Sequence, residues 1–269
     1  MRAIGRALAV LAAAVLVTAA AGWAASDAGP AQVQAEPVVA VDGFERLVSA
    51  GWGSAEVGGG WAVVTGGDGP FSVSAGAGSV VSPSGIRRVV HLPGVAVRDV
   101  DARVEVSFSA AGSGRQFGYL LVRRQSAGAY LRIGLMASGG KLLVRSQDSA
   151  GASVFADTDT GLGFSAGAPY VLRVQAEGAG PTTVRFKVWR EGAPEPAAWL
   201  SSGATGLGPQ VAGTLGVRTE TVRPSVCEVE AGWVSRGVGL RSGSSGRGGR
   251  LSSGRGSSRR FGRGGSRGR

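Results

Sequence analysis

Cysteine and histidine, which build disulfides, zinc sites and many catalytic triads, are scarce in this sequence. Its 269 residues include one cysteine, Cys227, and one histidine, His91. A single cysteine excludes an intramolecular disulfide and any zinc cluster built on cysteines. A Ser-His-Asp triad would have to use His91, and no nucleophile-elbow motif accompanies it. We therefore interpret Cys227 and His91 as ordinary strand residues.

Helical patterning is missing as well. Behind the N-terminal apolar run, no segment repeats apolar residues with the period of a helix. Glycine is abundant, at 48 residues, and an interior helical glycine costs about 1 kcal/mol relative to alanine. Glycine suits the turns between short strands, so its abundance favours a β protein.

Alternating apolar and polar runs predict the strands. Gly, Pro, Ser and Asp separate these runs, as they do in antiparallel hairpins. The predicted strands are 61–65, 71–74, 87–91, 101–108, 117–124, 130–136, 141–146, 170–175, 182–190, 213–218 and 226–234. The pattern predicts an all-β fold, an antiparallel sandwich of two sheets.

The first 35 residues predict an export signal. Arg2 and Arg6 precede an apolar run over 7–25, which is the order of a secretory signal helix. Val33-Gln34-Ala35 places small residues at the positions that a signal peptidase reads, so we expect cleavage after Ala35 and a secreted, extracellular protein. The alternative is an uncleaved membrane anchor with the rest of the chain outside, because the run nearly reaches the roughly 20 residues that span a bilayer.

Positive charge is concentrated at the C-terminus. The net charge is +11, and ten arginines with no acidic residue lie between Arg236 and Arg269. Residues 1–35 add the remaining charge, so residues 36–235 are neutral. The last segment has too few apolar residues to offset the entropy of ordering it. The chain therefore divides into a signal peptide (1–35), a β-sandwich domain (36–235) and a disordered Arg/Gly/Ser-rich tail (236–269).

The tail has three interpretations. Its flexible cations would attach to anionic wall polymer or to a membrane surface. Arg-Gly repeats also occur in RNA-binding segments, but aromatic residues are scarce here and an exported protein rarely meets RNA, so no specific nucleic acid is expected. The third interpretation is an inert tail or an out-of-frame end of a GC-rich gene.

Alternation along each predicted strand assigns its side chains to two faces. The expected core residues are Val100, Ala102, Val104, Val106, Phe108, Leu131, Ile133, Leu135, Val184, Phe186 and Val188. The opposite positions carry arginines mixed with aromatic residues. We expect Tyr130, Arg132 and Trp189 to share one exposed sheet face.

Several short stretches resemble a known family. They are Asp42-Gly43-Phe44-Glu45-Arg46, Gly51-Trp52-Gly53, Gly59-Gly60-Trp61, Arg98-Asp99-Val100-Asp101, Tyr130-Leu131-Arg132, Val188-Trp189-Arg190, and Glu195-Pro196 with Trp199. Residues 41–220 thereby resemble the exported concanavalin A-like (laminin G-like) jelly-roll domains common in actinobacteria. The resemblance implies a two-sheet jelly roll, with glycan binding or adhesion as its usual role. It also places Trp52 and Trp61 in core or hairpin packing.

Three carboxylates form the candidate catalytic set. Laminarinase-type enzymes on this fold use neighbouring carboxylates of one strand as nucleophile and acid/base. Asp99, Asp101 and Glu105 share one strand face in a similar way. The spacing is longer than in those enzymes and Arg103 lies between the acids, so we interpret the row as a solvated strand face with no catalytic role.

Asp157 and Asp159 form the candidate calcium site. Asp157-Thr158-Asp159-Thr160-Gly161 resembles the start of a calcium loop, but the later ligands and the closing glutamate are missing. We interpret it as an Asp-rich turn. No cofactor is expected, and calcium is the one metal left open.

The candidate glycan site combines aromatic and donor side chains. Sugar rings stack on aromatic faces while arginine and tyrosine donate hydrogen bonds to hydroxyls. The candidates are Trp189, Trp199, Tyr130, Arg132 and Arg185. The alternative is that Trp189 and Trp199 pack against each other under a loop.

The sequence thus predicts a secreted, non-catalytic β-sandwich module. We expect it to bind a glycan or cell-wall polymer or to mediate cell-surface contacts. The alternatives are a glycan hydrolase or lyase on the same fold, and an adhesive surface protein with no small ligand. The oligomeric state stays open.

Overall fold

The computed structural model describes residues 38–108, 114–222 and 227–231. Strands are the only regular elements in these ranges. The described part of the chain accordingly offers no helix that could cross a membrane. The predicted signal helix (1–35) and the predicted tail (236–269) lie outside the described residues.

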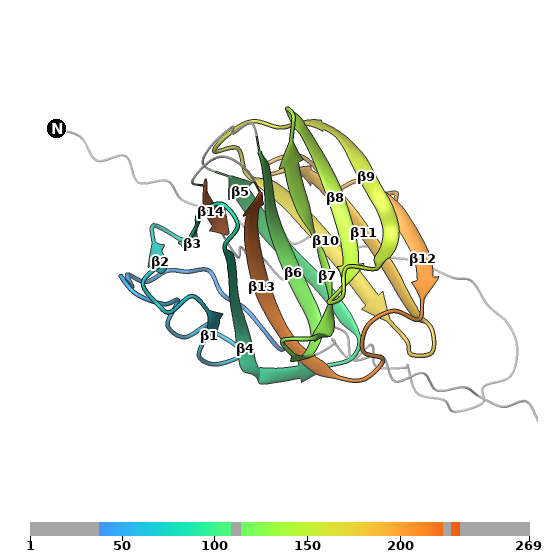
Figure 1. Cartoon of the computed structure of the whole chain (residues 1–269), viewed down its shortest axis with the longest axis horizontal. Coiled ribbons are helices and arrows are strands. Elements are labelled where there is room, and N and C mark those ends of the chain that lie inside the picture. The colour runs from blue at the N-terminus through green and yellow to red at the C-terminus, as the bar shows by residue number, and fades with distance from the viewer. Residues whose placement is uncertain (1–37, 109–113, 223–226, 232–269) are drawn as a thin grey trace, which may run out of the picture. The chain divides into compact units, whose positions relative to one another are not determined.

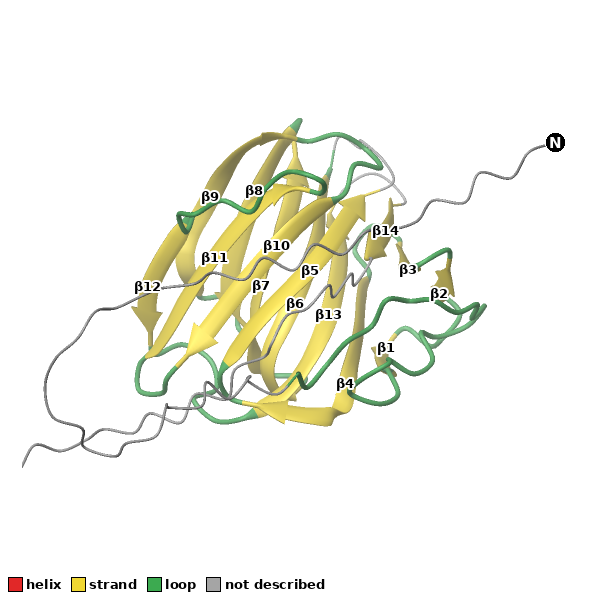
Figure 2. Ribbon diagram, turned by 180° about the vertical axis from the view of Figure 1, so that it is seen from behind, coloured by secondary structure: helices red, strands yellow, loops and turns green. Residues whose placement is uncertain are grey.

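Two antiparallel sheets of seven strands face each other (Figure 1). We call the sheet nearer the viewer in Figure 1 the front sheet. Its order is β1 (Ala62–Thr65), β4 (Arg87–Val97), β13 (Gly213–Val222), β6 (Arg115–Ser126), β7 (Ala129–Ser138), β8 (Lys141–Asp148) and β9 (Ser153–Gly163). Figure 2 shows the molecule from behind, with the back sheet toward the viewer. The back-sheet order is β12 (Ser201–Thr205), β11 (Thr182–Arg190), β10 (Tyr170–Glu177), β5 (Val100–Phe108), β14 (Cys227–Ala231), β3 (Ala77–Ser82) and β2 (Phe71–Ser74).

The core lies between the sheets and follows the period-two pattern of the strands. Every second residue of β5 is buried in it, from Val100 to Phe108, and β7 contributes Leu131, Ile133 and Leu135. All eleven residues assigned to the core from the sequence belong to this one cluster. The predicted all-β antiparallel sandwich is therefore confirmed.

Three strands were not predicted: β3, β9 and β12. The prediction of an Asp-rich turn at Asp157 and Asp159 is wrong, since both residues lie within β9. β9 and β12 are edge strands whose residues are mostly exposed or half-buried. Because little of an edge strand faces the core, such a strand needs no regular apolar alternation, and the sequence gives no signal for it.

Aromatic residues close one end of the core. Trp52 is fully buried between Phe44, Trp61 and Phe71, with ring centroids 5.0–5.8 Å from its own. The buried Asp42 accepts a hydrogen bond of 2.6 Å from Trp61 Nε1. The prediction that Trp52 and Trp61 serve packing is confirmed.

Arg123 interrupts β6 with a left-handed backbone, φ 54°. The pairing of β6 with both β7 and β13 shifts register here, which marks a β-bulge. The side chain is fully buried and donates to the carbonyl oxygens of Arg98 (2.6 Å) and Gly178 (2.7 Å) and to Thr182 Oγ1 (2.6 Å). Thr182 begins β11 of the back sheet. Arg98 and Gly178 lie in the connections that lead into the back-sheet strands β5 and β11. One guanidinium thus ties the two sheets together.

The bulge also changes which side chains face outward. Leu121 lies on the outer side of β6 and Val122 in the core. Strict alternation would send Arg124 into the core after Val122. The extra residue reverses the alternation, and Arg124 Nη1 lies 3.5 Å from His91 Nδ1 on the outer face of the front sheet.

Replacing the buried guanidinium tests its role. Arg123→Met should lower the free energy of unfolding by about 3–5 kcal/mol, because several buried acceptors lose a charged donor. Arg87→Gln is the control, since that side chain is exposed and its ion pair with Glu220 is long at 3.6 Å; the control should cost less than about 1 kcal/mol. Urea denaturation measures both. Equal stability of Arg123→Met and the parent protein would contradict the account.

Candidate functional site

The predicted glycan-binding residues do not share one face. Tyr130 and Arg132 lie on β7 of the front sheet, whereas Arg185 and Trp189 lie on β11 of the back sheet. Both pairs point away from the core, so they lie on opposite outer faces of the sandwich. The expectation of one shared face is wrong. Alternation fixes the face of a side chain within its own sheet and says nothing about which sheet the strand joins.

On the back sheet, the tryptophans are enclosed by charged side chains. Trp189 is only 4% exposed, and the Arg103 guanidinium lies 5.0 Å from its ring centroid. Trp199 is half-buried, and Arg173, Arg185 and Lys187 approach its ring to 5.6, 4.9 and 4.7 Å. Trp189 is therefore packed and is no open stacking platform.

The same cations have carboxylate partners. Arg173 pairs with Glu195 at 2.5 Å, and Lys187 pairs with the same carboxylate at 2.7 Å. Arg185 lies 3.5 Å from Glu177. Charge on this outer face is largely balanced, and the loop that carries Trp199 is fastened to the sheet.

The candidate catalytic acids are held in separate interactions. Asp101 accepts two bonds from Arg173, at 2.8 and 2.6 Å, and a further one from Gln175. Asp99 pairs with Arg98 at 2.8 Å and lies 3.5 Å from the buried Arg123. Burial raises the pKa of Glu105, and the nearby Glu191 raises it further. The geometry supports structural roles for Asp99 and Asp101. The interpretation of all three acids as one solvated strand face is wrong, because Asp99 precedes β5 and Asp101 is buried at 4% exposure, where it is paired with Arg173.

The candidate calcium ligands are paired with cations. Asp157 makes an ion pair of 2.5 Å with Arg145, and Asp159 lies 3.2 Å from Lys141. Hydrogen bonding to Arg145 lowers the pKa of Asp157, and the Gly161 amide together with Lys141 lowers that of Asp159. Among the described residues no cluster of three or more His, Cys, Asp or Glu could hold a metal ion.

The outer face of the front sheet carries a second set of buried aromatic residues. Phe117, Tyr119 and Leu121 of β6 pack there with Tyr130 and Met136 of β7. The Phe117 and Tyr119 rings are stacked, with centroids 5.5 Å apart and planes 8° apart. Residues 116–124 of β6 are all buried, so this strand is covered on both faces.

Three arginines cover these rings, and a fourth lies nearby on the same outer face. Arg132 and Arg218 lie over Tyr119, at 5.3 and 5.9 Å from the ring centroid, and Arg145 lies 5.1 Å from that of Phe117. Arg124 is the fourth, placed next to His91 by the bulge. We call the surface formed by Arg132, Arg145 and Arg218 over Phe117 and Tyr119, together with Arg124 beside His91, the arginine face. Cation–π contacts of this kind stabilise each pair by about 0.5–2 kcal/mol.

The geometry of the arginine face depends on a strand glycine. Gly134 lies opposite Tyr119 in the β6–β7 pairing. A Cβ at Gly134 would overlap the Gly118 carbonyl oxygen and the backbone and ring of Tyr119. The missing side chain lets the Tyr119 ring lie close over β7. Burial raises the pKa of Tyr119 to about 12, so its phenol is neutral at physiological pH.

The arginines keep hydrogen-bonding capacity that the described residues do not use. Arg218 Nη1 donates to Tyr130 Oη at 2.7 Å and Arg132 Nη2 to Gln147 Oε1 at 2.7 Å. The Nε atoms of Arg124, Arg132 and Arg218 are buried and have no acceptor among the described residues. Burial lowers the pKa of His91, and the neighbouring Arg124 lowers it further, which favours the neutral imidazole beside the Arg124 cation.

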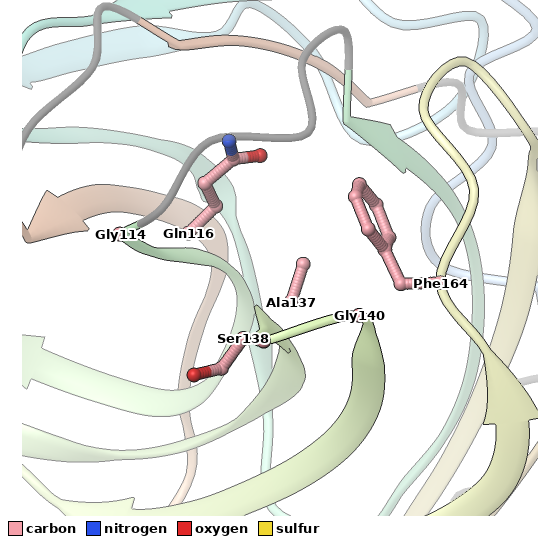
Figure 3. A pocket seen from close by; sticks show the side chains of 7 residues that line it. Gly114, Gln116, Ala137, Ser138, Gly140 and Phe164 are labelled. Carbon is pink, nitrogen blue, oxygen red and sulfur yellow. The ribbon is translucent and has the colours of Figure 1, made fainter.

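A small hollow lies at one end of the sandwich (Figure 3). Its volume is about 110 Å³, and it is lined by Gly114, Gln116, Ala137, Ser138, Gly139, Gly140 and Phe164. Ligand pockets usually measure roughly 300–1,000 Å³. The hollow is thus too small for a saccharide chain, which needs an open face.

The comparisons with known proteins give a fold and no family. Neither a protein-family model nor a curated protein matches the sequence. A double mutant of alginate lyase Aly36B, in complex with alginate tetrasaccharide, matches in structure with a TM-score of 0.50 and 10% identity, over 72% of this chain and 93% of that one. The carbohydrate binding module CBM66 from Bacillus subtilis matches with a TM-score of 0.45 and 16% identity, over 63% of this chain and 91% of that one. A Bacillus licheniformis β-glucanase matches with a TM-score of 0.45 and 10% identity, over 64% of this chain and 89% of that one. At these identities the likeness shows the fold alone.

The glycine beneath Tyr119 offers a test of the site's geometry. Gly134→Ala should cost about 1–3 kcal/mol of stability, because the new methyl group meets backbone atoms that cannot move aside easily. Gly163→Ala is the matched control: it lies in a front-sheet strand, and a Cβ there meets nothing within 4 Å. Thermal unfolding of the two variants measures the difference. A Gly134 variant as stable as the Gly163 variant would contradict the close packing of Tyr119.

Proposed function

We propose that this chain is an exported, non-catalytic module that binds glycans through the arginine face of the front sheet. The observation that carries the proposal is the layer of arginines held over stacked aromatic rings. Rings fix the guanidinium groups in place, and the half-buried groups of Arg132 and Arg145 remain accessible to hydroxyl and acidic oxygens. The predicted residues Tyr130 and Arg132 belong to this site, while Trp189, Trp199 and Arg185 do not.

The fold is compatible with saccharide binding. One structural neighbour, alginate lyase Aly36B, was solved with a bound tetrasaccharide. A binding role is favoured over hydrolysis because the carboxylates near the arginine face are tied to cations. Asp157 pairs with Arg145, and Glu220 pairs with Arg218 at 2.6 Å. A glycosidase needs two carboxyl groups that are free to exchange protons or attack the sugar.

The partner would be an extracellular glycan or a cell-wall polymer. This follows from the apolar run behind Arg2 and Arg6, which favours export, and from the neutral domain between the signal and the tail. The arginine-rich tail would add electrostatic attachment to an anionic wall polymer or membrane surface.

Matched substitutions on the two outer faces test the proposal. After a glycan array identifies a ligand, Arg132→Gln and Arg145→Gln should each weaken binding about 10-fold or more, since each removes a charge-assisted hydrogen bond worth about 1.5–3 kcal/mol. Arg185→Gln, on the back sheet, should leave the affinity unchanged. Calorimetric titration measures affinity, and circular dichroism checks that each variant is folded. No binding to any glycan, or loss of binding only in Arg185→Gln, would overturn the proposal.

A further inference from the structure

The two outer faces of the sandwich differ in how their arginines are neutralised. On the back sheet, Arg173, Arg185 and Lys187 have a carboxylate within 3.5 Å, whereas Arg103 lies over the Trp189 ring and forms no ion pair with a described residue. On the front sheet, Arg124 and Arg132 form no ion pair with any described residue, and the side-chain partners of their guanidinium groups are His91 and Gln147. The front sheet therefore holds cationic charge that its own acids do not balance.

A further cation lies beside Arg132. Arg132 and Arg218 contact the same Tyr119 ring, and Arg218 is only 3% exposed. Burial lowers the pKa of Arg132, and the Arg218 charge lowers it further. Two like charges held side by side repel each other, and partial burial strengthens the repulsion because water screens it less. Glu220 pairs with Arg218 at 2.6 Å and leaves Arg132 without a carboxylate partner among the described residues, so a negative group beside Arg132 would relieve the repulsion.

We infer that the arginine face selects glycans that carry oxyanions, either uronate carboxylates or sulfate esters. This inference rests on the proposed function and names its ligand class. Arginine is suited to the task because its planar guanidinium donates in pairs to such groups and keeps its charge at any physiological pH. A neutral glycan would leave the cations of Arg124 and Arg132 uncompensated, so binding it would gain less.

Because the polycationic tail also attracts anions, the experiment separates its contribution to glycan binding from that of the arginine face. The purified full chain is titrated with three probes of matched length: a galacturonate tetrasaccharide, the same tetrasaccharide with its carboxyl groups reduced to alcohols, and a chondroitin sulfate tetrasaccharide. A synthetic peptide of residues 236–269 is titrated in parallel. Each titration is repeated with Arg132→Gln, Arg124→Gln and the control Arg185→Gln.

The expected result is that at least one acidic tetrasaccharide binds about 10-fold or more tightly than the reduced one. Arg132→Gln and Arg124→Gln should each remove most of that preference, and Arg185→Gln should keep it. Binding of galacturonate assigns the oxyanion to a carboxylate. Because chondroitin sulfate carries uronate carboxylates as well, only binding that is tighter than that of galacturonate assigns a contribution to its sulfate esters.

Three outcomes would overturn the inference. Equal affinity for the reduced tetrasaccharide would leave glycan binding intact but remove the selection for oxyanions. An acidic preference that the tail peptide reproduces, and that Arg132→Gln does not change, would assign it to the tail. If no probe binds and the glycan array also detects no ligand, the proposed function itself is wrong.

Discussion

The buried guanidinium of Arg123 is the contact on which the arrangement of this sandwich depends. A two-sheet protein must fix how its sheets lie against each other, and apolar contacts between flat inner faces do this only weakly. Here a charged side chain from β6 of the front sheet reaches Arg98, Gly178 and Thr182 across the core. A charged donor buried without these acceptors would cost several kcal/mol, so the contact specifies one relative position.

The same bulge positions one arginine of the proposed site. By inserting one residue into β6 it turns Arg124 outward, next to His91. The stacked rings of Phe117 and Tyr119 lie further along the same strand, and Gly134 lets Tyr119 lie flat over β7. A structural constraint at one end of β6 and a glycine on its neighbour thus determine where the guanidinium groups lie.

The sequence predicted the repeating part of the fold well and the long-range part poorly. Val100 to Phe108 and Leu131 to Leu135 alternate clearly, because a strand with one face in the core must do so. The edge strand β9 lacks a clear apolar alternation, so the sequence predicts a turn at Asp157 and Asp159, which lie within β9. Sheet membership depends on pairing between distant strands, which alternation does not encode. For this reason the sequence predicts one shared face for Trp189 and Tyr130, whereas the two residues lie on opposite outer faces of the sandwich.

Only part of the proposed site can be predicted from the sequence. The pattern of one strand points to Tyr130 and Arg132, whereas no motif in the sequence points to Tyr119, Arg145 or Arg218. Their signal is weak: Arg145 and Arg218 sit at outward positions of their own strands, and only the pairing of β13, β6, β7 and β8 brings them together. Tryptophan often stacks on sugars, and for that reason Trp189 is a candidate binding residue in the sequence. In the structure it is buried beneath Arg103.

The most direct test of the central claim is to observe the arginine side chains themselves. Heteronuclear NMR resolves the Nε–H group of each arginine, and a glycan ligand can be titrated into the full protein. The account predicts that the resonances of Arg124, Arg132 and Arg218 shift with saturation, while those of Arg103, Arg173 and Arg185 on the back sheet stay in place. Shifts confined to the back-sheet arginines would contradict it.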